Sequence, residues 1–369
     1  MNCKAILSLA CAAFLMTAAA QVVAPQAGVP TWSVGDSWAM GAADIDLTSI
    51  MDALVENMQQ YLSGMTLNMT GEMSFYEMFE VTGQDSQFYN LAANQGVEMT
   101  SDVTISGAYS GQQMAATVHL VMTLKMNGMM YFTKDDMRLS KYDGTMDLNM
   151  TMSGNAGTLG NLNMTMDVSG NISVTFSPAL DLFDFPISVG DNWAINSTAT
   201  ITGAISGKVS MPGFGEIPIN QNLDSTVNLS ISASCPNTSN IALADGSSTT
   251  AYKIVYTGAD FSGSNIFLPA GVMYYSPDKR FVVSQELSFT DAMGGLSKAS
   301  TGSSGYTYGL SSAQSDQTLF TASPMSREAA TSAISGLGTS GTSILPLVIV
   351  AVVAVAIVAS AAFVIRRRA

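Results

Sequence analysis

The sequence predicts a mostly β protein with two duplicated antiparallel β-sheet units, either half-barrels or sandwiches, together with one amphipathic helix near residues 47–62 and a C-terminal transmembrane helix. Three observations predict this class: stretches of alternating apolar and polar residues, two short signatures that each occur twice, and an apolar run near the C-terminus. Alternation with a period of two is typical of antiparallel strands that place one face on a core and the other in water.

The N-terminal residues 1–20 have the features of a secretory signal peptide. Lys4 carries the positive charge, an apolar run follows, and the alanines at 18–20 provide a small-residue cleavage site. A lipid anchor at Cys11 is the alternative, but the sequence before this cysteine lacks the leucine that such anchors have three residues upstream. We therefore expect an exported mature chain that begins near Gln21.

Two signatures indicate an internal repeat. The sequence VGDSW at 34–38 returns as VGDNW at 189–193, and GMMYFTKD at 128–135 returns as GVMYYSPD at 271–278. Because both pairs occur in the same order, a repeat is favoured over chance. Each pair is typical of a Gly-Asp turn before a strand with a core tryptophan, followed later by a tyrosine-rich strand and a tight turn. We expect a first unit at 29–177 and a second unit at 178–292.

One segment follows a helical period instead of a strand period. Apolar residues recur at helical spacing from Leu47 to Leu62, where Asp46 or Thr48 can cap the start and Gly64 can end the helix. We expect this helix to cover the apolar face of the first sheet.

The C-terminal part predicts a membrane anchor. Residues 293–343 are rich in Ser, Gly, Thr and Ala and are expected to form a flexible stalk. Residues 344–365 are all apolar or small, and a helix of this length extends about 33 Å, enough to cross a bilayer. The arginines of the tail at 366–369 place that end in the cytoplasm. We therefore expect a single-pass protein of the cell membrane, with its N-terminal ectodomain outside.

Composition limits the possible partners of the ectodomain. Its only cysteine is Cys235, so internal disulfides are excluded. It holds all 28 acidic residues but 10 of the 14 basic ones, since Lys4 and the three tail arginines lie elsewhere, and its net charge is therefore −18. Such a surface repels nucleic acid. The predicted partners are the membrane, through the C-terminal helix, and either other envelope proteins or a hydrophobic ligand.

Methionine is unusually frequent, because 19 of the 25 methionines lie between Met40 and Met166. The Met-x-Met pairs at 150–152 and 164–166 resemble thioether pairs that Cu(I) accepts, but a strand places both members on its apolar face, where methionine usually packs as a core residue. We therefore expect no metal and no cofactor. A methionine-rich core is favoured, and a deformable surface for apolar ligands is the functional alternative. That surface would be lined by Met122, Met126, Met150, Met152, Met164 and Met166.

Seven N-x-S/T sequons are candidate glycosylation sites on an exported chain. Six of them place the asparagine on the polar side of an alternating strand, so that their glycans would point to solvent. The seven candidates are Asn68, Asn149, Asn163, Asn171, Asn196, Asn228 and Asn237.

The sequence predicts no catalytic constellation. A single histidine, His119, excludes a His-rich zinc site and a second histidine for acid–base work. Cys235 has no histidine partner in the sequence pattern, which argues against a nucleophile. The aspartates of the repeated signatures fit turn positions, where Asp satisfies backbone N–H groups. We therefore predict that the protein is not an enzyme.

The order of signal peptide, β-rich ectodomain, Ser/Thr/Gly stalk and terminal helix with an arginine cluster resembles that of many archaeal surface proteins, although the chain lacks the Pro-Gly-Phe motif of their sorted subset. This resemblance implies a non-enzymatic structural or interaction component of the cell envelope. More loosely, the tryptophan strand, the helix and the one-sided apolar strands are similar to the half-barrel of LolA/LppX-type lipoprotein carriers. That similarity implies the alternative function, a surface-tethered carrier of a lipid-like ligand in a methionine-lined groove.

Overall fold

The structure, a computed structural model, describes residues 26–48, 51–52, 55, 65–109, 112–155, 161–211, 215–262, 271–288 and 318–337. These residues form one antiparallel sheet of twelve strands and the helix α4, which confirms the mostly β class. The elements are β1 (Ser37–Asp46), β2 (Met65–Gln84), β3 (Phe88–Tyr109), β4 (Gln112–Thr133), β5 (Leu139–Asn155), β6 (Asn161–Leu180), β7 (Asn192–Met211), β8 (Gly215–Ala242), β9 (Ser248–Ser262), β10 (Gly271–Ser276), β11 (Phe281–Ser288), β12 (Thr318–Pro324) and α4 (Arg327–Gly336).

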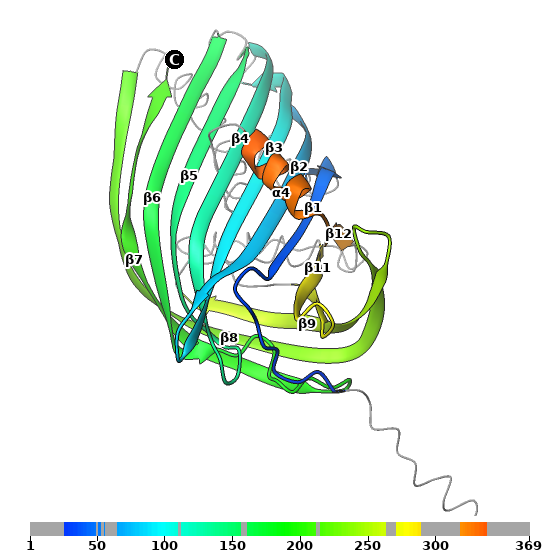
Figure 1. Cartoon of the computed structure of the whole chain (residues 1–369). Coiled ribbons are helices and arrows are strands. Elements are labelled where there is room, and N and C mark those ends of the chain that lie inside the picture. The colour runs from blue at the N-terminus through cyan, green and yellow to red at the C-terminus, as the bar shows by residue number, and fades with distance from the viewer. Residues whose placement is uncertain are drawn as a thin grey trace, which may run out of the picture.

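The sheet closes on itself to form a barrel. Each strand pairs with the next strand along the chain, and β1 pairs with β12 to complete the circle (Figure 1). The closing pair is short, because only Met40 with Pro324 and Gly41 with Ser323 are in register, whereas β3 and β4 pair along their whole length. The closed wall leaves neither β1 nor β12 as a free edge.

The boundary expected after residue 177 does not divide the sheet. β6 pairs with β7 from Thr165 and Ser210 to Ser177 and Thr198, so both predicted units contribute to one barrel. Two separate half-barrels or sandwiches are therefore replaced by a single sheet, in which strands of the two units satisfy each other's backbone hydrogen bonds. We call β1–β6 the first half of the barrel and β7–β12 the second half.

Both halves begin with the same hydrogen-bonded turn. Before β1, the backbone N–H of Ser33 donates to the carboxylate of Asp36 at 2.8 Å. Before β7, the backbone N–H of Ser188 donates to the carboxylate of Asp191 at 2.6 Å. The two aspartates of the repeated signature thus hold equivalent turns, as the sequence predicted.

The glycine of each turn completes the equivalence. Gly35 donates its N–H to the Val81 carbonyl at 2.8 Å, and Gly190 donates to the Cys235 carbonyl at 2.7 Å. Their φ angles are 95° and 99°, in the region that glycine adopts without strain. This shared geometry explains why the signature contains a glycine at this place.

The second signature also recurs as one element. In each half it ends the fourth strand and leads through a tight turn into the fifth, from β4 to β5 and from β10 to β11. Phe132 and Tyr275 hold equivalent places before the turn and are each 2% exposed. Met137 and Arg280 hold equivalent places within it, with φ angles of 56° and 61°. The two signatures therefore mark equivalent strands six positions apart in the barrel.

Alternate residues of the strands fill the interior with two apolar clusters. One is rich in aromatic side chains, where the Trp32 ring centroid lies 5.4 Å from that of Phe132 and 5.6 Å from that of Phe281. The segment before β1 carries Trp32, lies at the lower end of the barrel in Figure 1, and is bridged to the segment before β7 through Ala27 and Ile187. The other cluster is rich in methionine and occupies the inner face of the first half.

The helix expected near 47–62 is described in part. Thr48, Met51, Asp52 and Val55 are helical, and the Thr48 N–H donates to the Asp46 carboxylate at 2.8 Å, as expected for a cap. Met51 and Val55 are buried in the methionine-rich cluster, which agrees with the predicted apolar face. The other positions of this helix lie outside the described residues.

Part of the expected stalk is folded. Within 293–343, residues 318–324 form β12 and residues 327–336 form α4, which lies across the outside of β1–β3 (Figure 1). The reason is local: Ser326 caps α4 by accepting the Ala329 N–H at 3.1 Å, and the backbone of β12 completes the ladder between β1 and β11.

The apolar side of α4 packs against the barrel wall. Gly96 on β3 leaves room for Leu337, because a Cβ atom at position 96 would lie 2.4 Å from the Leu337 Cδ1 atom. At the other end of the helix, Arg327 pairs with Glu80 on β2 at 2.6 Å. The helix therefore holds β2 and β3 next to the closing strands from outside.

The signal peptide at 1–20, the transmembrane helix at 344–365 and the tail at 366–369 lie outside the described residues. In the part of the chain that the structure describes, no helix combines the length and the apolar character needed to cross a membrane.

Candidate functional site

The inner face of the first half carries a row of methionines, one from each of five adjacent strands. Met73 of β2 pairs with Met99 of β3, Met99 with Met122 of β4, Met122 with Met150 of β5, and Met150 with Met166 of β6. We call these five residues the methionine row. Its three central members are each 1% exposed, whereas Met73 and Met166 are half-buried.

The structure places all six methionines of the predicted lining on this inner face. Three belong to the methionine row, namely Met122, Met150 and Met166. Met152 and Met164 pair with each other in the adjacent row, and Met126 lies four residues further along β4. The alternation in the sequence was sufficient to find this face, but it did not reveal that methionines of different strands are directly paired.

The surroundings of the methionine row are packed. Leu47 and Met51 are fully buried and belong to the same cluster, together with Val55. Two hollows formed by described residues, of about 400 and 580 Å³, have no methionine in their lining, although the second reaches Leu148 and Val168 of the same cluster. This packing supports a methionine-rich core rather than an open groove.

A buried carboxylate lies on the same inner face. Glu77 of β2 is 5% exposed, and its two carboxylate oxygens accept hydrogen bonds from Gln95 Nε2 at 2.5 Å and from Gln285 Nε2 at 3.0 Å. Gln95 is the direct partner of Glu77 on β3, whereas Gln285 belongs to β11, beyond the closing strands β1 and β12. Burial raises the pKa of Glu77 to about 7, against the two amide donors, which lower it.

Sequence analysis missed this polar group. A signal was present, since Glu77 occupies the apolar register of its strand between Phe75 and Phe79. A charged residue in such a position needs a partner when it is buried. Gln285 could not have been found, because its approach to Glu77 depends on closure of the barrel by strands that are distant in the sequence.

The seven sequon asparagines all lie on strands. Six are exposed, whereas Asn149 on β5 is half-buried and donates its Nδ2 to Asp167 on β6. The exposed asparagines are Asn68, Asn163, Asn171, Asn196, Asn228 and Asn237. These positions agree with the orientation that the alternation predicted.

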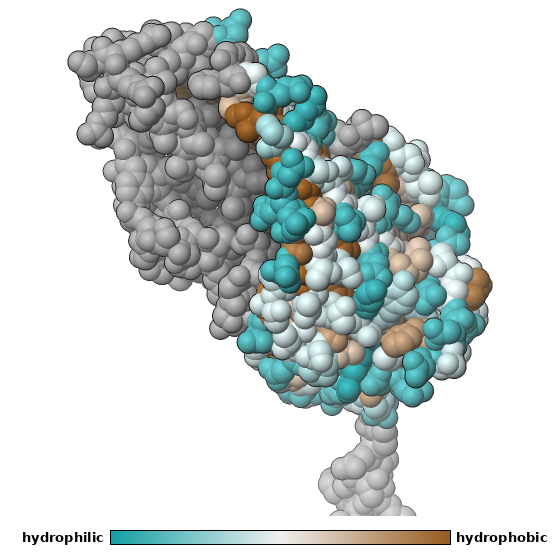
Figure 2. All heavy atoms as spheres, turned by 90° about the vertical axis from the view of Figure 1, so that its left-hand side faces the viewer, coloured by the Kyte–Doolittle hydropathy of each residue, from teal (hydrophilic) through white to brown (hydrophobic). Residues whose placement is uncertain are grey.

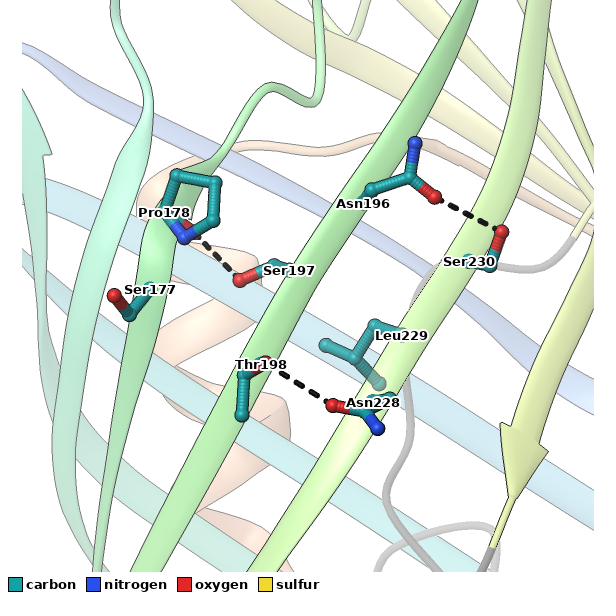
Figure 3. A pocket seen from close by; sticks show the side chains of 8 residues that line it. All are labelled: Ser177, Pro178, Asn196, Ser197, Thr198, Asn228, Leu229 and Ser230. Carbon is teal, nitrogen blue, oxygen red and sulfur yellow. Dashed lines mark hydrogen bonds between the residues drawn. The ribbon is translucent and has the colours of Figure 1, made fainter.

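Two of the sequons face each other across β7 and β8. Asn196 Oδ1 accepts a hydrogen bond from Ser230 Oγ at 3.0 Å, and Asn228 Oδ1 accepts one from Thr198 Oγ1 at 3.1 Å (Figure 3). The hydroxyl of each sequon therefore binds the asparagine of the other. Both contacts use the amide oxygen and not Nδ2, the atom to which a glycan is attached. The four side chains line the hollow of about 400 Å³.

The second hollow, of about 580 Å³, crosses β4–β7 and has charges of both signs. Its lining includes Lys125, Asp147, Asp167 and Lys208. Lys208 also pairs with Glu216 at 2.7 Å. Opposite charges on an exposed sheet face neutralise each other and remain solvated, so this hollow indicates no particular ligand.

His119 lies on the outer face between Asp102 of β3 and Ser153 of β5. Its Nδ1 is 2.9 Å from Asp102 Oδ1, an order of residues that resembles a Ser-His-Asp hydrolase triad. However, the His119 and Asp102 side chains are 49% and 60% exposed, and the described contacts include no hydrogen bond from Ser153 to His119. We interpret the group as a hydrogen-bonded pair on the surface.

The remaining candidate groups give no hard metal site or nucleophile. Cys235 is fully buried, and burial raises the pKa of its thiol to about 11, which disfavours the reactive thiolate. Among the described residues, no three His, Cys, Asp or Glu side chains are arranged to hold a metal ion. Comparison of the chain with protein families, curated proteins and solved structures returned no match.

Proposed function

We propose that the protein is a non-enzymatic cell-surface protein, in which a membrane-anchored barrel acts as a structural or interaction component of the envelope. The observation that carries this proposal is the outer face of the barrel, where six sequon asparagines are exposed on the strands. Hydrophilic residues predominate on the described part of the face seen in Figure 2. A barrel with an apolar, packed interior and a hydrophilic outer surface suits a domain displayed on the cell surface rather than an enzyme.

Features of the sequence supply the anchor in this proposal. The apolar run at 344–365 and the arginines that follow it have the length and charge of a single membrane-spanning helix with a cytoplasmic end. The equivalent turns at Asp36 and Asp191 support a further part of the proposal, that the two halves arose by duplication.

The titratable groups support a non-enzymatic role. Glu77 has a raised pKa, but it is almost inaccessible and both of its oxygens are hydrogen-bonded. His119 is accessible, but it lies on an open sheet face without a concave substrate site.

The alternative proposal is a tethered carrier of a lipid-like ligand. The methionine-rich inner face favours it, because thioether side chains adapt to variable apolar shapes. The burial of Leu47 and Met51 in the same cluster argues against it, since these side chains occupy space that a ligand would need. We therefore rank the envelope component first.

The test uses the full-length protein purified from its own host. We expect it in the membrane fraction, released by detergent and not by salt, and labelled by a membrane-impermeant biotin reagent on intact cells. Mass spectrometry of its peptides should find glycans on exposed sequon asparagines. Asn228→Gln should remove one glycan, and Asn127→Gln should remove none, because Asn127 is exposed but is not in a sequon.

Two results would contradict the proposal. An unmodified protein that is not labelled on intact cells would exclude surface display. A lipid that reproducibly copurifies with the protein in native mass spectrometry would favour the carrier instead.

A further inference from the structure

The methionine row differs from the Met-x-Met pairs visible in the sequence. Residues i and i+2 of a strand lie on the same face about 7 Å apart. Directly paired residues of adjacent antiparallel strands are closer, with Cβ atoms about 5 Å apart. Met122 on β4 pairs with Met150 on β5, and Met150 pairs with Met166 on β6, so Met150 has a methionine directly beside it on each side.

The length of the row extends this arrangement. Met99 continues it on β3 and Met73 on β2, so five adjacent strands each present one thioether from the same inner face. Each methionine side chain has three rotatable bonds, and its sulfur can move to meet a neighbour. Adjacent strands are about 5 Å apart, so the whole row spans about 19 Å and only three neighbouring members can approach a single centre.

Packing alone does not require methionine at these places. The second half has the same turns and the same strand order, yet its described buried side chains include no methionine and consist of Ile, Val, Leu, Ala, Tyr, Phe and Cys, with a few small polar residues. A barrel wall of this construction can thus be filled without sulfur. The concentration of thioethers on paired positions of the first half calls for a chemical reason.

The chemistry of the donors selects the ligand. Thioether sulfur is a soft, uncharged donor that favours Cu(I) and similar soft cations over Zn(II), Ca(II) or Mg(II).

We propose that Met122, Met150 and Met166 form a thioether site for one soft monovalent cation, Cu(I). The site lies inside the first half and is independent of surface display. It needs no hard ligand and no redox step, because the ion binds and leaves as Cu(I).

The test uses full-length protein in detergent and Ag(I) as a probe that has the same charge and softness and does not change oxidation state. Cys235, the only cysteine of the expected mature chain, is first replaced by alanine, because thiols also bind Ag(I). Methionine methyl groups labelled with ¹³C report which side chains respond. We expect one Ag(I) per chain and shifts concentrated on the methyl groups of Met122, Met150 and Met166.

The decisive variant is Met122→Leu, Met150→Leu and Met166→Leu combined. Leucine has nearly the same volume as methionine, so the packing is retained while three sulfur atoms are removed. We expect Ag(I) affinity to fall by about tenfold or more. The matched control replaces Met40, Met69 and Met137, which are buried and lie outside the row, and should leave the affinity unchanged.

Equal affinities of the two triple variants, or methyl shifts spread over all methionines, would overturn the proposal. Circular dichroism and thermal unfolding establish that each variant is folded. If the row variant is not folded, Met150→Leu alone is compared with Met137→Leu alone, with the same expectations on a smaller scale.

Discussion

The two halves of the barrel share a backbone plan but differ inside. The turn at Ser33 to Asp36 is repeated at Ser188 to Asp191 with the same donors and acceptors. The interior between these turns is not repeated, since methionine is frequent among the buried side chains of the first half and absent from the described buried side chains of the second. The comparison shows that a few turn residues define the strand plan, while the interior is free to acquire its own chemistry.

One pair of equivalent positions makes the contrast specific. Met40 of β1 pairs with Glu77 of β2, and the equivalent Ile195 of β7 pairs with Ile231 of β8. The same place in the wall therefore holds a buried carboxylate in one half and an isoleucine in the other. The turns and the aromatic residues that precede them should respond alike to mutation in both halves, whereas the other interior positions should not.

The largest effect is expected at Phe132 and Tyr275, the equivalent aromatic residues before the two tight turns. Replacement of either residue by alanine should lower the free energy of unfolding by about 3–5 kcal/mol, because a large, fully packed ring leaves a cavity. Urea unfolding of the two variants measures the loss. A loss at one position that is less than half of the loss at the other would show that the halves are not equivalent scaffolds.

The second effect is specific to the first half. Because the pKa of Glu77 is raised from 4.5 to about 7, the unfolded chain releases this proton at lower pH than the folded chain does. The stabilisation is therefore present below about pH 4.5 and is lost as the pH rises through about 7, a change of about 3 kcal/mol.

Glu77→Gln should remove this pH dependence and make the protein more stable than the wild type at about pH 8. Urea unfolding at about pH 5 and about pH 8 provides the measurement. Ile231→Val, at the equivalent place in the second half, serves as the control and should change stability equally at both pH values. A pH profile of Glu77→Gln that matches the wild type would contradict the assignment.

A smaller effect is expected at the turn glycines. Gly35→Ala and Gly190→Ala should each cost about 1–2 kcal/mol, since alanine is strained at these φ angles although no atom lies near the added methyl group. Thermal unfolding of both variants tests the backbone explanation. Gly28→Ala is the control, because its surroundings are also open and it has no positive φ.

The smallest effect concerns Arg280, which lies 3.0 Å from Asp36 and also donates to the Thr31 carbonyl at 2.7 Å. The equivalent residue of the first half is Met137. Arg280→Met should therefore cost about 1 kcal/mol or less, since the ion pair is partly exposed, and the loss should shrink at high salt. A loss that does not depend on salt would assign the effect to packing instead.

The alternation and the repeated signatures predicted the antiparallel class, the inward side of the methionine strands and the equivalent turns. These features depend on residues that are close together in the sequence. The turns at Asp36 and Asp191 are an example, because their hydrogen bonds join residues only three positions apart. Closure into one barrel was not predictable, because the pairing of Met40 with Pro324 joins strands that are almost 300 residues apart.

The candidate sites also divide into those that local sequence predicts and those that depend on strand pairing. The exposed asparagines followed from strand alternation alone. The methionine row could be predicted only with knowledge of the register between strands. A shift of one residue in the pairing would have placed other residues opposite each other. Gln285 and its contact with Glu77 required both the register and the closure.

The position of β12 near the end of the chain has a consequence for biosynthesis. A ribosome produces the chain from its N-terminus, so β1–β11 exist before the strand that closes the barrel has been made. Until Thr318–Pro324 emerges, the nascent protein is an open sheet in which β1 and β11 each have one unpaired edge and the inner face is accessible. A chain that terminates before Thr318 therefore remains an aggregation-prone sheet, and the interior is easiest to load in the interval before the last strand arrives.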